Sequence, residues 1–268
     1  MKKIFHIPAV LALVAALLAG CGQKTAPGQT LGQTGDSGPA ASAGPDAQAG
    51  EEQMEPGVFR SGQGVLNYLL YIPENPEGDM PLIVYLHGNS GKGETLQALT
   101  DSDGFPRYLA SGALGQVDGY VLIPQLPDRY SGWEEVRDQL MDCIGQIEAD
   151  YAIDSSRISL TGHSMGGTGV WNLAIAYPDR FSCIVPLSGS ARTTERNLTA
   201  LAGMHIWAFA GGADEVVPPE PAQAFVEALD SPQAKMTVIG GAGHEDVPAL
   251  VYLSEEYGVV DWMLSGGA

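Results

Sequence analysis

The chain has 268 residues, of which 44% are hydrophobic and 17% are charged, a balance that indicates a packed globular fold rather than a disordered chain. It carries 13 Lys and Arg against 32 Asp and Glu, which gives a formal net charge of −19. A surface so acidic repels phosphate backbones, so nucleic acid is excluded as an expected partner. Three cysteines are too few for a disulfide-rich scaffold.

Residues 1–20 have the pattern of a bacterial leader. Lys2 and Lys3 precede an apolar stretch, 7–18, which is short for a membrane span, and the leader is followed by Cys21. The run Leu-Ala-Gly-Cys resembles the lipobox of bacterial lipoproteins, in which cleavage precedes a cysteine that carries a diacylglycerol. The resemblance implies lipidation of Cys21 and a protein anchored to the cell membrane on its extracytoplasmic side. The alternative is an ordinary cleaved signal peptide in which Cys21 is incidental.

Residues 21–56 follow as a low-complexity segment rich in Gly, Ala, Gln, Ser, Pro and Thr. Such a composition buries too little apolar surface to offset the entropy of ordering the chain, so it predicts a disordered tether. The folded domain is then expected over residues 57–268.

Strand patterns alternate with helical patterns from residue 57 onward. Short apolar runs that end near Gly or Pro predict buried strands, and apolar residues at helical spacing predict helices between them. The expected strands are 66–72, 82–86, 120–123, 158–160, 183–187, 206–209 and 236–239, with helices within 133–151, over 165–177, near 221–229 and over 250–264. This alternation predicts one α/β domain, with a mostly parallel central sheet and helices on both faces.

The sequence Gly162-His163-Ser164-Met165-Gly166 has the pattern G-x-S-x-G. It follows a predicted strand and opens a predicted helix, a setting in which the serine occupies a sharp turn and presents its hydroxyl above the sheet. With 35 glycines in the chain the pattern alone is weak. Its position between strand and helix makes Ser164 a candidate nucleophile.

Two further residues come in the order that a Ser-Asp-His triad on this fold requires. Asp214 follows the predicted strand 206–209, and His244 follows the strand 236–239. His244 would take the proton of Ser164, and Asp214 would orient the imidazole and stabilise its charged form. Asp246 is a competing acid, but its closeness to His244 in sequence places it awkwardly for the far ring nitrogen. Glu215 is expected to be solvated.

The sequence His87-Gly88-Asn89 directly follows the predicted strand 82–86. This is the usual place for one oxyanion-hole amide, from Gly88 or Asn89, and the second comes from the residue after the nucleophile, Met165. His87 is a candidate for substrate binding, although a histidine here also braces the loop. Trp133, in the loop after 120–123, is a candidate to line the pocket.

These residues together resemble the α/β-hydrolase superfamily, in particular the esterases near dienelactone hydrolases, polyester depolymerases and feruloyl esterases. The resemblance is carried by PLIVYLHGNSG (81–91), VLIPQ (121–125), SRISLTGHSMGGTGVWNLAIAYPDRF (156–181), WAFAGGADEVVP (207–218) and GAGHEDV (241–247). It implies the α/β-hydrolase fold and a serine hydrolase. About 17 residues, 188–204, separate two predicted strands where relatives insert a lid, so no large cap domain is expected.

The sequence therefore predicts a surface-tethered serine carboxylesterase that works through an acyl-enzyme on a small or polymer-end ester. A small peptidase, thioesterase or acyltransferase on the same fold is an alternative, and so is a catalytically inactive lipoprotein that binds a ligand at the cell surface. No cofactor and no metal are expected, because the histidines are scattered and Cys143 and Cys183 lack ligand spacing. Both cysteines are expected to be buried thiols, and a disulfide between them stays open.

Overall fold

The computed structural model describes residues 59–62, 66–93, 95–102 and 104–268. The predicted leader, the lipidation of Cys21 and the tether lie outside these residues. The described residues belong to one compact unit. Within them, none of the helices has the length and apolar character that crossing a membrane requires.

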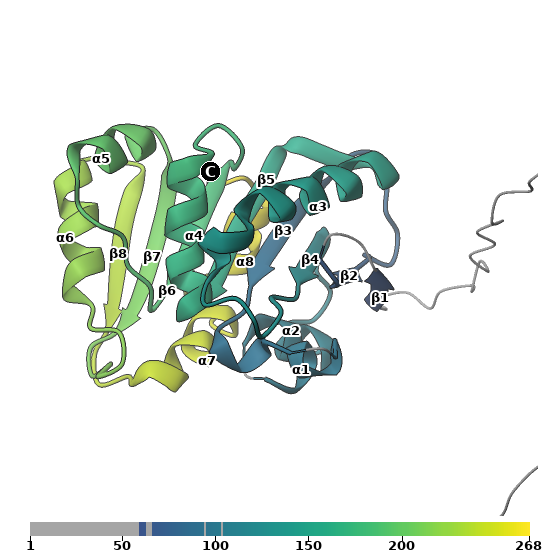
Figure 1. The fold of residues 1–268 in the computed structure, drawn as a ribbon, viewed down its shortest axis with the longest axis horizontal. Helices are drawn as coiled ribbons and strands as arrows, with labels where there is room; N and C mark the ends of the chain where they lie inside the picture. Colours follow the sequence, from purple (N-terminus) through teal and green to yellow (C-terminus); the bar gives the residue numbers. More distant parts are fainter. Residues whose placement is uncertain (1–58, 63–65, 94, 103) are drawn as a thin grey trace, which may run out of the picture. The chain divides into compact units, whose positions relative to one another are not determined.

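Eight strands of the described chain form a single sheet in the order β1-β2-β4-β3-β5-β6-β7-β8 (Figure 1). β2 pairs antiparallel with β1 and with β4, whereas all the other neighbouring strands are parallel. The parallel strands therefore end at one edge of the sheet, where the loops that follow them meet. The strands are β1 (Phe59–Gly62), β2 (Tyr68–Tyr71), β3 (Met80–Leu86), β4 (Tyr120–Pro124), β5 (Ile153–His163), β6 (Cys183–Leu187), β7 (His205–Gly211) and β8 (Ala234–Ile239).

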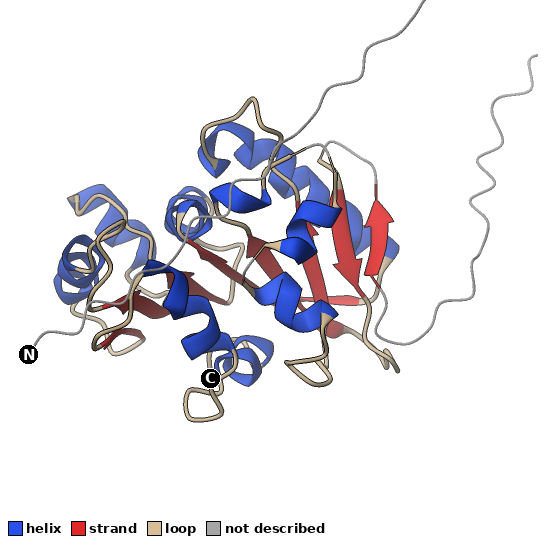
Figure 2. Ribbon diagram, turned by 90° about the horizontal axis from the view of Figure 1, so that it is seen from below, coloured by secondary structure: helices blue, strands red, loops and turns tan. Residues whose placement is uncertain are grey.

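Helices lie on both sides of the strands (Figure 2). The α-helices are α1 (Gln97–Asp101), α2 (Phe105–Ala110), α3 (Arg137–Asp150), α4 (Met165–Ala176), α5 (Glu195–Leu201), α6 (Glu220–Leu229), α7 (Val247–Tyr252) and α8 (Val259–Leu264). The described chain also contains three short 3₁₀ helices, η1 (Asn89–Gly91), η2 (Trp133–Val136) and η3 (His244–Asp246).

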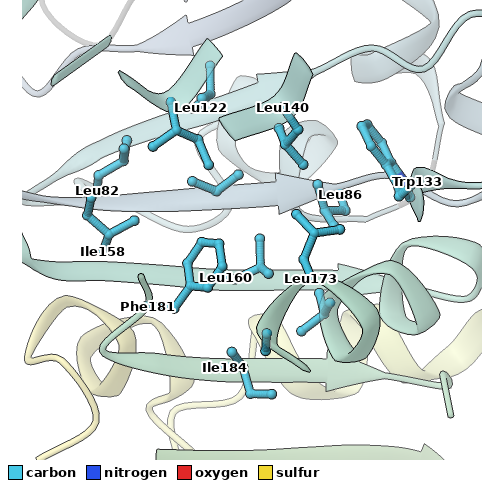
Figure 3. Close-up of a cluster of buried hydrophobic side chains, with 14 of the residues drawn as sticks. Leu82, Leu86, Leu122, Trp133, Leu140, Ile158, Leu160, Leu173, Phe181 and Ile184 are labelled. Carbon is cyan, nitrogen blue, oxygen red and sulfur yellow. The ribbon is translucent and has the colours of Figure 1, made fainter. Parts of the chain in front are cut away.

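The alternation of side chains along β3 explains why both faces of the sheet are covered. Leu82, Val84 and Leu86 belong to one buried cluster, and Ile83 and Tyr85 belong to another. Successive side chains of a strand point to opposite faces, so each face has its own apolar core and each needs helices over it. Figure 3 shows the first cluster, in which Leu82 and Leu86 lie near side chains of neighbouring strands and helices.

The fold confirms the predicted mostly parallel sheet, and each predicted strand falls within or overlaps an observed one. The predicted closing helix 250–264 is wrong. The chain instead forms α7 and α8, and Gly258 between them has a positive φ of 56°, which a continuing right-handed helix does not allow. No large cap follows β6, where the described chain contains a loop and the seven residues of α5.

Candidate active site

Ser164 stands between β5 and α4 in a strained backbone conformation, with φ 60° and ψ −119°. Its amide donates to the carbonyl of Leu187 on β6 at 3.0 Å, and its own carbonyl accepts the amide of Thr168 at 3.0 Å. A non-glycine residue adopts a positive φ only where its surroundings enforce it. These bonds to a strand and a helix enforce the sharp turn that the G-x-S-x-G pattern predicts, and the serine is left half-exposed.

The two glycines of the pattern allow β3 to approach the turn closely. A Cβ on Gly166 would lie 1.8 Å from the carbonyl oxygen of Leu86, and one on Gly162 would lie 2.4 Å from the same atom. Any side chain at either position would collide with backbone that cannot move away. The glycines thus let the nucleophile turn pack directly against the end of β3.

A continuous chain of hydrogen bonds joins the three predicted triad residues. His244 Nε2 lies 2.9 Å from Ser164 Oγ, and His244 Nδ1 lies 2.8 Å from Asp214 Oδ2. His244 is 8% exposed and Asp214 is 5% exposed, so the pair is largely shielded from water. They reach one another from three loops, after β5, β7 and β8, that end at the same edge of the sheet.

Asp214 is held as a carboxylate by its surroundings. Burial by itself would raise the pKa of Asp214, but the backbone bond from Val217 and the bond with His244 bring this pKa below its usual value. Its second oxygen, Oδ1, accepts the amides of Val216 at 2.9 Å and of Val217 at 2.8 Å. A carboxylate fixed on both oxygens holds the facing imidazole in one orientation.

The competing acid Asp246 does not pair with His244, whose Nδ1 lies against Asp214. Its Oδ2 accepts the amide of Gly243 at 2.8 Å, and its side chain is exposed. This bond closes the short turn that carries His244. Glu215 is exposed, as expected.

Two of the predicted oxyanion-hole residues, Met165 and Gly88, lie next to Ser164. Met165 is the first residue of α4, so its amide has no acceptor within the helix. Gly88 lies against the turn, because a Cβ placed on it would be 3.5 Å from Ser164 Cβ. The carbonyl of Gly88 accepts from His87 Nδ1 at 2.6 Å. In a trans peptide the carbonyl and the next amide point in opposite directions, so the Asn89 amide points away from the His87 ring.

His87 and Trp133 are buried, which favours the bracing role that the sequence also offered for His87 over contact with substrate. Their exposed fractions are 1% and 0%. His87 Nε2 accepts the amide of Leu126 at 2.9 Å, and the His87 carbonyl accepts Trp133 Nε1 at 3.1 Å. Burial lowers the pKa of His87 to about 4, so the ring is neutral near pH 7. Both residues brace the loop that carries Gly88 and Asn89 instead of offering surface to a ligand.

His163 is a contact of the site whose role the sequence did not reveal. Its Nε2 donates to the carbonyl of His244 at 3.0 Å, and the two ring centroids are 4.5 Å apart. Burial, with a smaller contribution from His244, lowers the pKa of His163 to about 4. Its position directly before Ser164 was the only available signal, since the partner lies 81 residues further along the chain.

Cys143 and Cys183 are both free and buried, which answers the question that the sequence left open. They lie in different apolar clusters. Among the residues that the structure describes, no three His, Cys, Asp or Glu side chains gather in a way that could hold a metal ion.

The chain is similar to proteins of a known family. The model of the family named Esterase matches residues 63–235 of the chain. The chain belongs to the Esterase family. A curated relative is the poly(3-hydroxyalkanoate) depolymerase C of Paucimonas lemoignei, which is 27% identical over 159 residues. That match covers 53% of this esterase-family chain and 36% of the depolymerase, so the chain spans about a third of that relative's length.

Solved structures share the α/β-hydrolase fold of this esterase-family chain. A thermostable esterase has a TM-score of 0.65 and 23% identity, and the match covers 77% of this chain and 62% of the other. The feruloyl esterase module of Clostridium thermocellum complexed with sinapinate has a TM-score of 0.56 and 15% identity, covering 78% and 86%. The acetyl xylan esterase of Aspergillus awamori has a TM-score of 0.58 and 15% identity, covering 79% and 100%.

Proposed function

We propose that the protein is a serine carboxylesterase that cleaves an ester bond through an acyl-enzyme on Ser164. The observation that carries the proposal is the hydrogen-bonded chain from Ser164 Oγ through His244 to Asp214, with distances of 2.9 and 2.8 Å. Serine is a weak nucleophile near neutral pH, and a base in contact with its hydroxyl removes that limit. Membership of the Esterase family supports the same reaction class.

The first half-reaction forms the acyl-enzyme. Ser164 Oγ attacks the carbonyl carbon of the ester while His244 Nε2 takes the hydroxyl proton. The bond between the carbonyl carbon and the alcohol oxygen then breaks, and His244 returns its proton to the leaving alcohol. The carboxylate of Asp214 stabilises the imidazolium between these two proton transfers.

The second half-reaction releases the acid. Water attacks the acyl carbon, gives its proton to His244, and the bond to Ser164 Oγ breaks as the oxygen recovers a proton. The amide of Met165 and an amide of the Gly88–Asn89 segment would donate to the oxyanion in both halves. Loss of one such donor raises a barrier by about 3 kcal/mol.

The short connection between β6 and β7 supports a small or polymer-end ester as the substrate. The names of the relatives point the same way, since they include a poly(3-hydroxyalkanoate) depolymerase, a feruloyl esterase module and an acetyl xylan esterase. A peptidase, thioesterase or acyltransferase would use the same triad. A surface protein that only binds has no need of three groups in hydrogen-bond contact, so the triad geometry favours an enzyme.

The test is hydrolysis of short-chain 4-nitrophenyl esters by the purified protein and by Ser164→Ala, His244→Ala and Asp214→Asn. We expect kcat to fall by about 10³-fold or more in each variant, because the members of a triad act as a unit. A fluorophosphonate should label the wild type and leave Ser164→Ala unlabelled.

Two matched controls separate the triad from general damage. Ser111→Ala changes an exposed serine, and Asp246→Asn changes the exposed acid that sequence alone made a competitor. Both should retain activity within about threefold. If the folded wild type shows neither turnover nor labelling, the esterase proposal fails and the binding protein takes its place.

A further inference from the structure

We propose that a hollow beside the nucleophile helix binds a carboxylate of the substrate through Arg192, so that the preferred esters carry a negative charge. This inference rests on the proposed esterase function and names the substrate class for that site. The chemistry of this hollow differs from that of other hollows on the protein.

The hollow has a volume of about 580 Å³ and is walled by α4, the loop after β6, α5 and α6. Donor groups dominate its lining, and no carboxylate takes part. It is lined by Thr168, Asn172, Ser190, Ala191, Arg192, Thr193, Asn197, Pro221 and Ala224.

The absence of acid from this lining is notable in a chain with 32 Asp and Glu against 13 Lys and Arg. Three other hollows of the described chain each contain two acidic side chains. These pairs are Glu227 with Asp230, Glu245 with Asp246, and Glu255 with Asp261. In the hollow lined by Arg192, an anion would therefore contact a cation and neutral hydrogen-bond donors, and no carboxylate of the lining would repel it.

Arg192 is available for a ligand. Within the described residues its guanidinium makes no ion pair, and its side chain is exposed. Its backbone is fixed, because its carbonyl accepts Asn197 Nδ2 at 2.9 Å. A planar guanidinium offers two parallel N–H donors to a carboxylate, and the surrounding hydroxyl and amide groups can supply more.

The hollow adjoins the nucleophile through Thr168, which lies one helical turn after Ser164. Four residues of an α-helix rise by about 6 Å. The amide of Ser190 donates to Thr168 Oγ1 at 3.4 Å, and a Cβ on Gly189 would lie 2.2 Å from the backbone of Gly167. The loop that carries Arg192 therefore lies directly on the first turn of α4.

The helices that complete the wall are neighbours of α4. α5 contacts both α4 and α6, and Figure 1 shows α5 beside α6. A ligand that reacts at Ser164 and extends along α4 meets this wall within about one or two helical turns, or about 6–12 Å of rise. A monoester of a dicarboxylic acid with three to five methylene groups spans a distance of that order.

The test compares two series of 4-nitrophenyl esters of matched length. One series holds the monoesters of glutaric, adipic and pimelic acid, and the other holds the neutral esters of valeric, hexanoic and heptanoic acid. We expect the wild type to have a kcat/KM at least tenfold higher on the best charged ester than on its neutral match. In Arg192→Gln this ratio should fall by tenfold or more, and Arg192→Lys should recover part of it.

Arg196→Gln is the matched control, because Arg196 is an exposed arginine near Arg192 that does not line the hollow. It should keep the wild-type ratio. The proposal is overturned if the wild type prefers the neutral ester at every length, or if Arg192→Gln and Arg196→Gln shift the ratio equally. Equal loss on both series in Arg192→Gln would also overturn it, since that result means a structural role.

Binding without turnover separates this proposal from the esterase function. In Ser164→Ala, monomethyl adipate should raise the midpoint of thermal unfolding, and the added change Arg192→Gln should abolish that shift. If this binding is present while the wild type hydrolyses no ester, the anion site stands and the esterase function falls. If turnover is normal but neither the binding nor the preference exists, the anion site falls alone.

Discussion

His163 contacts His244, which is the general base in the proposed mechanism. Its Nε2 donates to the carbonyl of His244, and its ring lies against the ring of His244 with centroids 4.5 Å apart. The low pKa of His163, about 4, keeps this ring uncharged near neutral pH. An uncharged neighbour would not repel the imidazolium that the proposed mechanism forms on His244. We therefore propose that His163 is a positioning residue for His244.

Two substitutions at His163 separate the hydrogen bond from the ring contact. His163→Phe keeps a ring but loses the donor, and we expect kcat to fall by about tenfold, because a net hydrogen bond of about 1.4 kcal/mol corresponds to that factor. His163→Gln can place an amide donor near the same carbonyl and should recover part of the loss. KM should change little in either variant. A merely structural role would lower the unfolding midpoint while leaving kcat of the folded fraction unchanged.

The segment from β3 to η1 is held in place by hydrogen bonds from the loop after β4 and from η2. The amide of Leu126, after β4, donates to His87 Nε2, and Trp133 Nε1 on η2 donates to the His87 carbonyl. His87 and Trp133 also stack edge to face, with centroids 4.9 Å apart. The position of Gly88 and Asn89 thus depends on residues that lie 39 and 46 positions beyond His87 in the sequence.

Trp133→Phe tests this bracing, with Trp171→Phe as its matched control. Both tryptophans are fully buried, but Trp171 Nε1 has no hydrogen-bond partner among the described residues. The two substitutions remove similar volume, and only Trp133→Phe leaves a buried carbonyl without its donor. We expect Trp133→Phe to lower the free energy of unfolding by about 1–3 kcal/mol more than Trp171→Phe, measured by urea denaturation. Equal losses would show that the bond to His87 contributes nothing.

Sequence periodicity predicts strands that are apolar along their whole length, and it misses helices that are too short to show a helical period. β3, β4 and β6 are apolar along nearly their whole length, so their patterns identify them. α1, α2 and α5 have five to seven residues each, too few for a helical period to show. The region 250–264 carries enough apolar residues for one helix, yet Gly258 and the turn before it divide it.

Some residues of the candidate site could likewise be predicted from the sequence, and others could not. Ser164, Asp214 and His244 could be identified because each follows a strand and comes in a characteristic order. The contact of His163 with His244, the burial of Trp133 and the acid-free lining around Arg192 depend on which segments meet in space. No local pattern encodes them, so the sequence left His87 open between binding substrate and bracing the loop, and it offered Trp133 as a pocket residue although that side chain is buried.

Two buried histidines, His87 and His163, couple the stability of the protein to pH. Burial lowers the pKa of both His87 and His163 to about 4, from an ordinary value of 6.5. Between these values the unfolded chain binds more protons than the folded one. The free energy of unfolding contributed by these groups is therefore complete above about pH 6.5 and is lost as the pH falls toward 4.

A second effect of acid has the opposite sign. Lowering the pH relieves repulsion among the carboxylates of a chain with a net charge of −19, which raises the free energy of unfolding. The comparison that isolates the histidines is urea unfolding of the wild type and of His163→Gln at pH 7.5 and pH 5.0. Glutamine does not titrate, so the variant should lose less stability between the two pH values than the wild type does. An identical pH dependence in His163→Gln and the wild type would mean that His163 takes up a proton in the folded protein as it does in the unfolded chain. His163 would then be charged at pH 5.0, which would contradict its description as an uncharged neighbour of His244.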